Sequence, residues 1–296
     1  MFSAFIGIDW SGARGARQPG IQLAAARPGN GVPDTWLADD GRHWGRDNVR
    51  DRLLAEASET ISAPVLVGID FAFAHPFHDE GAYYPGFAAS PAEVPALWQM
   101  VETVCADDLH LYGGAMFAAD GVGDYYLSPK NHGALHYRSR RRVTEQASRA
   151  SARAPSPTFK AIGADNVATG SMAGMRLIHA LKAELGDALA VWPFEKVSPA
   201  RLPAMVLVEI FPSYYFHAAG LNPARNAAVD PGFMTAALNA WSSNGVGADY
   251  APRGSDADEA DAMISAAALR HIAGTSGCWH APADALMEGW IFGVPG

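Results

Sequence analysis

Two apolar stretches that each end in an aspartate constrain the fold of this chain most. Residues 64–70 read Pro-Val-Leu-Val-Gly-Ile-Asp, and residues 4–9 read Ala-Phe-Ile-Gly-Ile-Asp. A continuous apolar run of the first kind is typical of a strand buried on both faces, as in the centre of an α/β sheet. Both stretches therefore predict strands, with Asp9 and Asp70 at their carboxyl ends.

The rest of the chain also alternates between strand and helix patterns. Further strands are predicted at residues 21–26, 35–38, 188–192 and 205–211. Helices are predicted at residues 48–58, 91–105, 171–185, 230–241 and 256–272. Strands, then a helix, then a buried strand indicate an antiparallel meander that crosses over to a parallel neighbour. We expect one α/β domain that spans residues 1–296.

Residues 71–160 fit this alternation least. Apart from the predicted helix at 91–105, the segment is rich in Gly, Tyr and Arg. Long connections of this kind are uncommon in compact domains unless they cover a site. We therefore interpret residues 71–160 as an insertion that forms a lid or a substrate platform.

Composition limits the compartment and the partners. The formal net charge of -9 opposes bulk binding to phosphate backbones, so a nucleic-acid substrate would need a local basic patch. The two cysteines form no disulfide framework and no metal-binding motif, which fits a reducing compartment. No stretch has the pattern of a signal peptide or the length of a membrane span. We expect a cytoplasmic protein without a membrane partner.

Carboxylates recur where predicted strands and a helix meet solvent. Asp9 and Asp70 follow strands, Glu209 lies in the predicted strand at 205–211, and Asp258 and Asp261 begin the last long helix. Neighbouring strands are about 4.8 Å apart, and helix residues three apart share a face. Buried acids are costly unless they are paired or bind a cation. An oxygen-only donor set suits Mg²⁺ or Mn²⁺.

Each acidic residue also has an ordinary structural explanation. Asp9 is placed like a turn former or a helix cap, and Glu209 like a carboxylate on an edge strand. Asp258 suits the positive end of a helix dipole. Asp261 lies a full turn into the helix between two alanines, and this explanation does not extend to it.

The order of these motifs resembles the RNase H-like superfamily. The motifs are GIDWSG, a helix, VGIDFAFA, and a final helix that contains DEADA. The terminal Asp-x-x-Asp pair is most similar to that of the Holliday-junction resolvase branch. The stretches FKAIGADNVATGSMAGMRLIHALKAE, VWPFE and VEIFPS are similar to a family of predicted RNase H-like nucleases known as a domain of unknown function.

The resemblance implies a fold and a site. The fold is a mixed five-stranded sheet with helices on both faces and a long insertion after the fourth strand. Asp9 matches the central metal ligand, Asp70 the acid of the fourth strand, and Asp258 and Asp261 the pair on the last helix. Glu209 matches a motif of the narrower family and joins the expected catalytic set. The implied cofactor is Mg²⁺ or Mn²⁺.

A basic run offers candidate substrate contacts. Residues 138–142 contain four arginines, and Tyr125, Tyr126 and Tyr137 nearby can stack on bases. A solvated charged surface explains the run equally well. The expected substrate-binding residues are Ser11, Arg138, Arg140, Arg141, Arg142 and Lys160.

Two other motifs have competing explanations. His75 and His78, beside Asp79 and Glu80, have transition-metal ligand types, but an exposed loop explains them better. Residues 168–174 resemble a glycine loop that holds phosphate before a helix, although the Lys of a P-loop is absent. A helix cap at Ser171 explains this stretch as well.

The sequence leaves three functions open. The first is a nuclease or phosphodiesterase that uses two metal ions to hydrolyse nucleic acid. The second is a nucleotide-dependent phosphotransferase of the actin and sugar-kinase fold, which also opens with a strand like IGID. The chain is short for its two domains and lacks a second phosphate motif. The third is a non-catalytic protein that binds a nucleotide or a protein in the same pocket.

Overall fold

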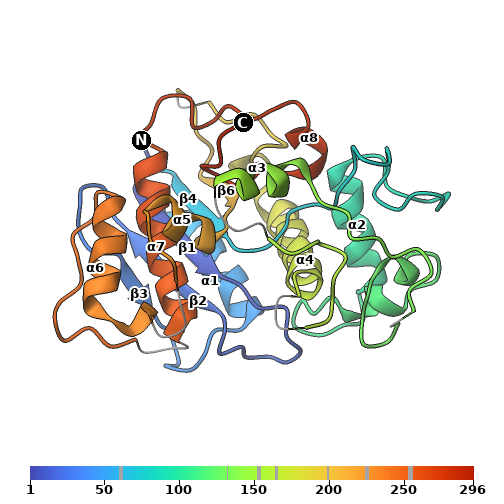
Figure 1. Cartoon of the computed structure of the whole chain (residues 1–296), viewed down its shortest axis with the longest axis horizontal. Coiled ribbons are helices and arrows are strands. Elements are labelled where there is room, and N and C mark those ends of the chain that lie inside the picture. Colours follow the sequence, from blue (N-terminus) through green and yellow to red (C-terminus); the bar gives the residue numbers. More distant parts are fainter. Residues whose placement is uncertain are drawn as a thin grey trace.

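A six-stranded mixed sheet forms the centre of the protein in the computed structural model (Figure 1). The structure describes residues 1–59, 63–131, 133–151, 155–163, 166–198, 200–223, 227–252 and 256–296. The strand order is β3-β2-β1-β4-β6-β5. The strands are β1 (Ala4–Asp9), β2 (Gln22–Ala26), β3 (Asp34–Trp36), β4 (Val65–Ile69), β5 (Leu189–Val191) and β6 (Met205–Glu209).

The sheet has an antiparallel half and a parallel half. Strands β1, β2 and β3 form an antiparallel meander, in which Asp9 lies opposite Gln22. Strand β4 pairs in parallel with β1, and β6 pairs in parallel with both β4 and β5. The carboxyl ends of β1, β4, β5 and β6 therefore meet at one edge of the sheet, as the sequence predicts for Asp9 and Asp70.

The expected sheet of five strands is corrected to six. The last strand in the sequence, β6, lies between β4 and β5, so β5 becomes an additional edge strand. All five residues of β6 are buried, whereas β5 has only three residues. The long apolar run of β6 is thus suited to the interior and the short run of β5 to the edge.

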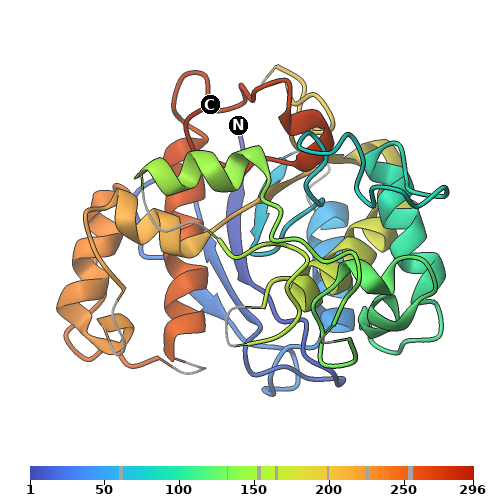
Figure 2. The same ribbon diagram turned by 45° about the vertical axis from the view of Figure 1, so that its right-hand side comes forward.

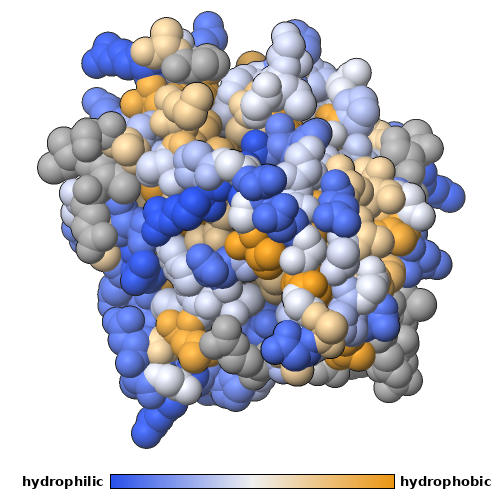
Figure 3. All heavy atoms as spheres, turned by 90° about the vertical axis from the view of Figure 1, so that its left-hand side faces the viewer, coloured by the Kyte–Doolittle hydropathy of each residue, from blue (hydrophilic) through white to orange (hydrophobic). Residues whose placement is uncertain are grey.

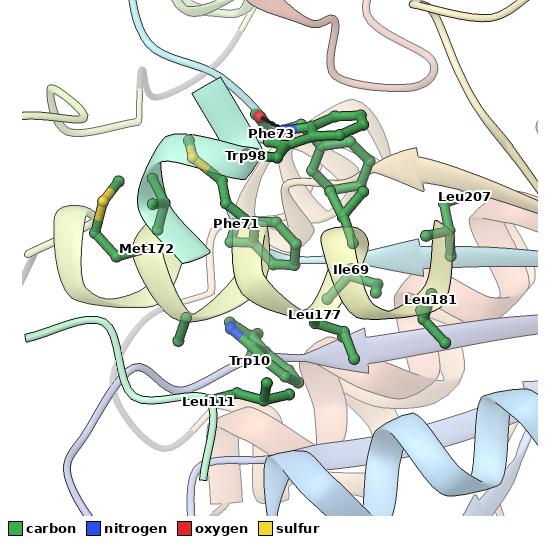
Figure 4. Close-up of a cluster of buried hydrophobic side chains, with 14 of the residues drawn as sticks. Trp10, Ile69, Phe71, Phe73, Trp98, Leu111, Met172, Leu177, Leu181 and Leu207 are labelled. Carbon is green, nitrogen blue, oxygen red and sulfur yellow. Dashed lines mark hydrogen bonds between the residues drawn. The ribbon is translucent and has the colours of Figure 1, made fainter. Parts of the chain in front are cut away.

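Helices cover both faces of the sheet, as expected (Figures 1 and 2). One face packs against α1 (Arg46–Glu59) and α4 (Ala168–Leu185), with α2 (Val94–Val104) outside α4. In Figure 4, Trp10 and Phe71, which follow β1 and β4, lie between the strands and α4, and their rings are 5.8 Å apart. The first residues after these strands are thereby fixed against the core.

The opposite face packs against α7 (Asp256–Ile272), α5 (Pro212–Ala218) and α6 (Pro231–Ala240). Helix α7 makes the closest approach, because a Cβ at Gly7 of β1 would lie 2.4 Å from the backbone oxygen of Ala262. Only glycine leaves room for a backbone at this distance. Gly7 therefore allows α7 to lie directly on β1.

The segment 71–160 is not a detached lid. Its buried residues, including Phe73, Tyr84 and Trp98, belong to the same apolar cluster as β1 and β4. The indole nitrogen of Trp98 donates to the backbone oxygen of Phe73 at 2.8 Å (Figure 4). The segment also contains 3-10 helices Gly114–Ala118 and Gly123–Tyr125 and all of α3 (Val143–Ser151), which the sequence did not predict.

Two further 3-10 helices, Gly186–Ala188 and Ala227–Val229, and a short helix α8 (Ala285–Glu288) complete the described elements. Both termini lie on the same side of the molecule (Figure 2). On the face that carries α6, hydrophilic residues dominate and apolar residues form small separate patches (Figure 3). None of the helices in the described ranges has the length and apolar character needed to cross a membrane.

Candidate functional site: an acidic cluster beside a cleft

Asp9 and Asp70 occupy matching ends of neighbouring parallel strands. Ile8 of β1 is in register with Ile69 of β4, so the two aspartates follow the same rung of the ladder. The backbone N–H of Asp70 donates to the oxygen of Ile8 at 3.0 Å. This pairing fixes the backbones of the two aspartates about one strand spacing apart, roughly 4.8 Å.

Helix α7 adds the second pair of acids. Asp9 lies two residues after Gly7 on β1 and therefore points to the same face, towards α7. At the start of α7, a Cβ on Gly20 would lie 3.3 Å from an Asp258 side-chain oxygen and 3.7 Å from the Ser11 Cβ. Asp258 thus lies beside the loop that follows Asp9.

The four aspartates influence one another's ionisation. Burial raises the pKa of Asp9 well above its usual value, and repulsion from Asp261, Asp70 and Asp258 raises it further. Burial, Asp261 and Glu209 raise the pKa of Asp70 in the same way. For Asp261, loss of hydration and the nearby Asp258 raise the pKa to about 7. We call these four side chains the acidic cluster.

The chemistry of these donors fits a hard divalent cation. All four are carboxylates, and a cation would remove the repulsion that raises their pKa values. Within the ranges that the structure describes, however, no group of three or more His, Cys, Asp or Glu side chains is arranged to hold a metal ion. The acidic cluster is therefore a set of suitable donors and not a preformed coordination shell.

A cleft of about 430 Å³ begins at the acidic cluster. Asp70 lines it on one side, and Ser11, Gly12 and the start of α4 line it on another. The loop and the helix touch, because the indole nitrogen of Trp10 donates to the Gly170 oxygen at 3.1 Å. At this helix start the N–H groups of Ala168, Thr169 and Ser171 already donate to the Lys160 oxygen, the Asn166 side chain and the Val167 oxygen. The cleft therefore brings carboxylates together with the Ser11 hydroxyl.

Arg46, the first residue of α1, shapes the loop after Asp9. Its guanidinium is buried and donates to the backbone oxygens of Ser11 at 3.0 Å, Ala13 at 2.9 Å and Gly15 at 3.3 Å. It also donates to the His110 oxygen at 2.7 Å. One side chain therefore holds three backbone positions of the loop at once. No sequence motif points to Arg46, because its partners are backbone atoms.

Glu209 is held by Arg142 and lines the cleft beside Asp70. Its two oxygens accept from the Arg142 guanidinium at 2.7 and 2.5 Å, and one of them also accepts from the Phe73 N–H at 3.1 Å. Arg142 also donates to Glu145 at 2.9 Å. Because both Glu209 oxygens are already used in this buried pair, we leave Glu209 out of the candidate metal ligands.

Glu288 secures the same wall of the cleft. Its carboxylate accepts from the N–H groups of Phe77 at 2.6 Å, His78 at 2.8 Å and Val143 at 2.7 Å. The buried carboxylates Glu145, Glu209 and Glu288 therefore fix the start of α3 and the segment after β4. This part of residues 71–160 is rigidly attached.

Comparison with known proteins found no matching protein family, no similar curated protein and no similar solved structure. The residues and their geometry are therefore the only basis for a function.

The basic run at residues 138–142 does not form one surface. Arg140 is buried, pairs with Asp79 and donates to the oxygens of Pro76, Ala82 and Tyr83. Arg142 is buried in the pair described above. The prediction that these two arginines bind substrate phosphate is corrected, because their donors are occupied inside the protein.

The other expected substrate contacts lie apart from one another. The Arg138 side chain is 74% exposed and lies 3.5 Å from Glu80. Arg141 donates to the Pro155 oxygen, and Lys160 is half-buried. Ser11 lines the cleft, and its hydroxyl accepts from the Ala13 N–H at 3.3 Å. Of this set, Ser11 is the residue placed beside the acidic cluster.

The two remaining motifs have structural roles. His75 is buried, not in an exposed loop, and its ring bonds to Thr158 and Tyr126, each at 2.8 Å. Helix α4 begins at Ala168, so Ser171 is not its cap; its hydroxyl donates to the Val167 oxygen at 3.0 Å. Residues 164–165, which belong to the stretch FKAIGADNVATGSMAGMRLIHALKAE, lie outside the described residues.

Proposed function

We propose that this protein is a divalent-metal-dependent phosphodiester hydrolase, a nuclease, with an RNase H-like fold. The observation that carries the proposal is the acidic cluster. Asp9 from β1, Asp70 after β4, and Asp258 and Asp261 from α7 are far apart in the sequence, yet they lie close enough to raise one another's pKa values. Protein interiors rarely retain such repulsion unless a cation relieves it.

The topology supports the fold part of the proposal. An antiparallel meander of β3, β2 and β1 is followed by β4 parallel to β1, with an acid at the end of each central strand. The resemblance of the sequence motifs to the RNase H-like superfamily implies this arrangement of the first four strands. Helix α7, which carries the final acidic pair, packs on β1 and so brings that pair to the strand that carries Asp9.

In the proposed site, Asp9, Asp70, Asp258 and Asp261 hold Mg²⁺ or Mn²⁺. When bound, the ions supply a Lewis acid that activates a water molecule and stabilises the leaving oxygen. Asp9 is buried, and Asp70 and the α7 pair both raise its pKa, so we take it as the central residue of the cluster. The Ser11 hydroxyl and the start of α4 border the space where the phosphate would bind.

The substrate is proposed to be a nucleic acid or nucleotide. The cleft of about 430 Å³ lies within the usual range for a small-ligand site and admits one nucleotide unit of a longer strand. Its lining combines carboxylates, the Ser11 hydroxyl and aromatic side chains. Because the chain carries a net charge of -9, the affinity for a phosphate backbone has to come from bound cations and a few local arginines.

Two measurements test the proposal. Calorimetric titration with Mn²⁺ should show binding to the wild-type protein and its loss in Asp9→Asn. Hydrolysis of bis(4-nitrophenyl) phosphate and of single-stranded, duplex, hybrid and branched nucleic acids should require Mg²⁺ or Mn²⁺. Removal of a central catalytic ligand should lower the rate by at least about 10²-fold.

Asp187→Asn is the matched control, because Asp187 is exposed and precedes the amino end of β5, away from the acidic cluster. It should keep both metal binding and activity. Hydrolysis that survives Asp9→Asn would refute the nuclease proposal. Absence of any Mn²⁺ binding would instead favour a non-catalytic protein that binds its ligand in the cleft.

A further inference from the structure

A second pocket lies at the same edge of the sheet as the acidic cluster. Its volume is about 370 Å³, and the residues that line it are Arg17, Gln22, Leu37, Gly41, Arg42, His43 and Trp44. We call it the arginine pocket. The lining includes three basic side chains and no acidic one. In a protein with a net charge of -9, this is a local reversal of sign.

The position of the arginine pocket follows from the sheet. Gln22, which lines it, lies opposite Asp9 in the ladder between β1 and β2. The turn before Gln22 also contains Gly20, which is in contact distance of Asp258. The arginine pocket therefore begins one strand away from the acidic cluster. The cleft spans the ends of β1, β4 and β6, where Ser11, Asp70 and Glu209 line it.

The arginine pocket, the acidic cluster and the cleft all lie along the carboxyl edge of β1 and β4. The strand order places the arginine pocket at β2, beside the acidic cluster at β1 and β4, and the cleft extends from β1 across β4 to β6. Three strand spacings of about 4.8 Å separate β2 from β6, roughly 15 Å in total. This length exceeds one phosphodiester unit and suits a strand that continues past the site of hydrolysis.

The side chains of the arginine pocket differ in how far their polar groups are already engaged by other residues of the protein. Arg17 donates to Asp40 at 2.6 Å and to the His43 oxygen at 3.0 Å, so part of its charge is already compensated. Arg42 is exposed, and among the described residues its guanidinium has no ion-pair partner; only its backbone N–H is engaged, by Asp40 at 3.1 Å. Leu37 is 52% exposed and adds apolar surface. A phosphate with an attached base matches this combination.

We propose that the arginine pocket binds the flanking part of a single-stranded polynucleotide substrate, with Arg42 as its main phosphate contact. The inference rests on the proposed function, because it assigns the substrate class of the same active site. It also replaces the expected basic patch: the phosphate-binding charge comes from Arg17 and Arg42, not from Arg140 and Arg142, which are internal.

The test compares Arg42→Gln with Arg27→Gln. Each variant removes one exposed arginine, but Arg27 follows β2 at the opposite, amino edge of β1. Binding of a fluorescein-labelled 12-nucleotide oligodeoxythymidine is measured by anisotropy on the full chain without metal, over a range of salt concentrations. Hydrolysis of bis(4-nitrophenyl) phosphate with Mn²⁺ is measured on the same preparations.

Arg42→Gln should weaken oligonucleotide binding about three- to tenfold at low salt and reduce the salt slope by about 0.7. Arg27→Gln should stay within about twofold of the wild type, because it changes only the net charge. Hydrolysis of the small diester should be unchanged in Arg27→Gln, because Arg27 lies at the opposite edge of the sheet from the acidic cluster.

Equal losses of binding in the two variants, or no loss in Arg42→Gln, would overturn the proposal that the arginine pocket binds the polynucleotide. A wild-type protein that hydrolyses neither substrate would instead contradict the proposed function. The anisotropy comparison needs no catalysis, so the two failures are distinguishable.

Discussion

At the scale of single residues, one buried guanidinium serves two buried carboxylates. Arg142 pairs with both Glu145 and Glu209, and burial of this crowded group raises the pKa of Glu145 to about 7. Arg142→Met would leave two buried acids without a cation. We expect a loss of about 3–5 kcal/mol in the free energy of unfolding, measured by urea denaturation.

Two further variants separate this effect from a general effect of charge. Arg50→Ala breaks an exposed pair with Asp51 and should cost less than about 1 kcal/mol. Arg142→Met combined with Glu145→Gln and Glu209→Gln should recover part of the stability, because no unpaired charge then stays buried. A loss below about 1 kcal/mol for Arg142→Met alone would contradict the role assigned to the pair.

Substitution of Asp261, unlike that of Arg142, is expected to stabilise the metal-free protein. The Asp261 pKa of about 7 reflects loss of hydration and the nearby Asp258, so at pH 8 its charge destabilises the metal-free protein. Asp261→Asn should raise the unfolding free energy at pH 8 in EDTA by about 1–2 kcal/mol. The same variant should lose the stabilisation by Mn²⁺. Destabilisation in EDTA would show that the carboxylate has a structural partner instead.

At this scale the sequence predicts some roles and misses others. Asp9 and Asp70 are recognisable because each ends an apolar strand, and Asp261 because it interrupts an apolar helix. Arg140 and Arg142 look like surface charges, since their partners Asp79 and Glu209 are more than 60 residues away. A run of like charges therefore does not show which of its members face the interior.

At the scale of elements, the contact between β1 and α7 determines where the acidic pair of the helix lies. Gly7→Ala would place a Cβ 2.4 Å from the Ala262 backbone oxygen and 2.7 Å from the Ala266 nitrogen. Helix α7 would have to move, and we expect a cost of about 1–3 kcal/mol in thermal or urea unfolding. Because Asp258 and Asp261 move with the helix, Mn²⁺ affinity should fall as well.

Gly31→Ala is the control for this prediction. Gly31 has no neighbour within 4 Å of an added Cβ, so the change should stay within about 0.5 kcal/mol of the wild type. If Gly7→Ala were as harmless as Gly31→Ala, close packing of α7 on β1 would not be what positions the acidic pair.

Strands β1, β2, β4 and β6 were predictable because every residue in them is buried and most of these residues are apolar. The order of the strands in the sheet was harder to predict. The position of β6 between β4 and β5 depends on tertiary pairing, and nothing local encodes it. Helix α3 was missed because its polar sequence VTEQASRAS resembles an exposed loop, while Thr144, Glu145 and Ser148 are in fact buried through hydrogen bonds.

At the scale of the whole molecule, the interior carries more acids than cations near the carboxyl edge of the sheet. The pKa values of Asp9, Asp70, Asp261 and Glu145 are all raised, and burial is the first cause in each. The folded protein therefore binds more protons than the unfolded chain between about pH 4 and pH 7. By linkage, stability is greatest at the acidic end of this window and falls as the pH rises through it.

The final prediction joins this pH dependence to the proposed metal. In EDTA, the melting temperature should fall between pH 5.5 and pH 8, with about 1.4 kcal/mol lost per pH unit for each extra proton that the folded state holds. At pH 8, Mn²⁺ at 100 times its dissociation constant should restore about 2.7 kcal/mol, because it binds only the folded state. At pH 5.5 it should restore less, since protons compete for the same oxygens.

Two variants separate the response of the melting temperature to Mn²⁺ from its dependence on pH. Asp9→Asn should remove the response to Mn²⁺ and part of the pH dependence, whereas Glu145→Gln should remove only its own share of the pH dependence and keep the response to Mn²⁺. Glu145 is bonded to Arg142, and it is not a member of the acidic cluster. Were Mn²⁺ to stabilise the wild type and Asp9→Asn equally, the ion would bind elsewhere, and the raised pKa values would reflect burial alone.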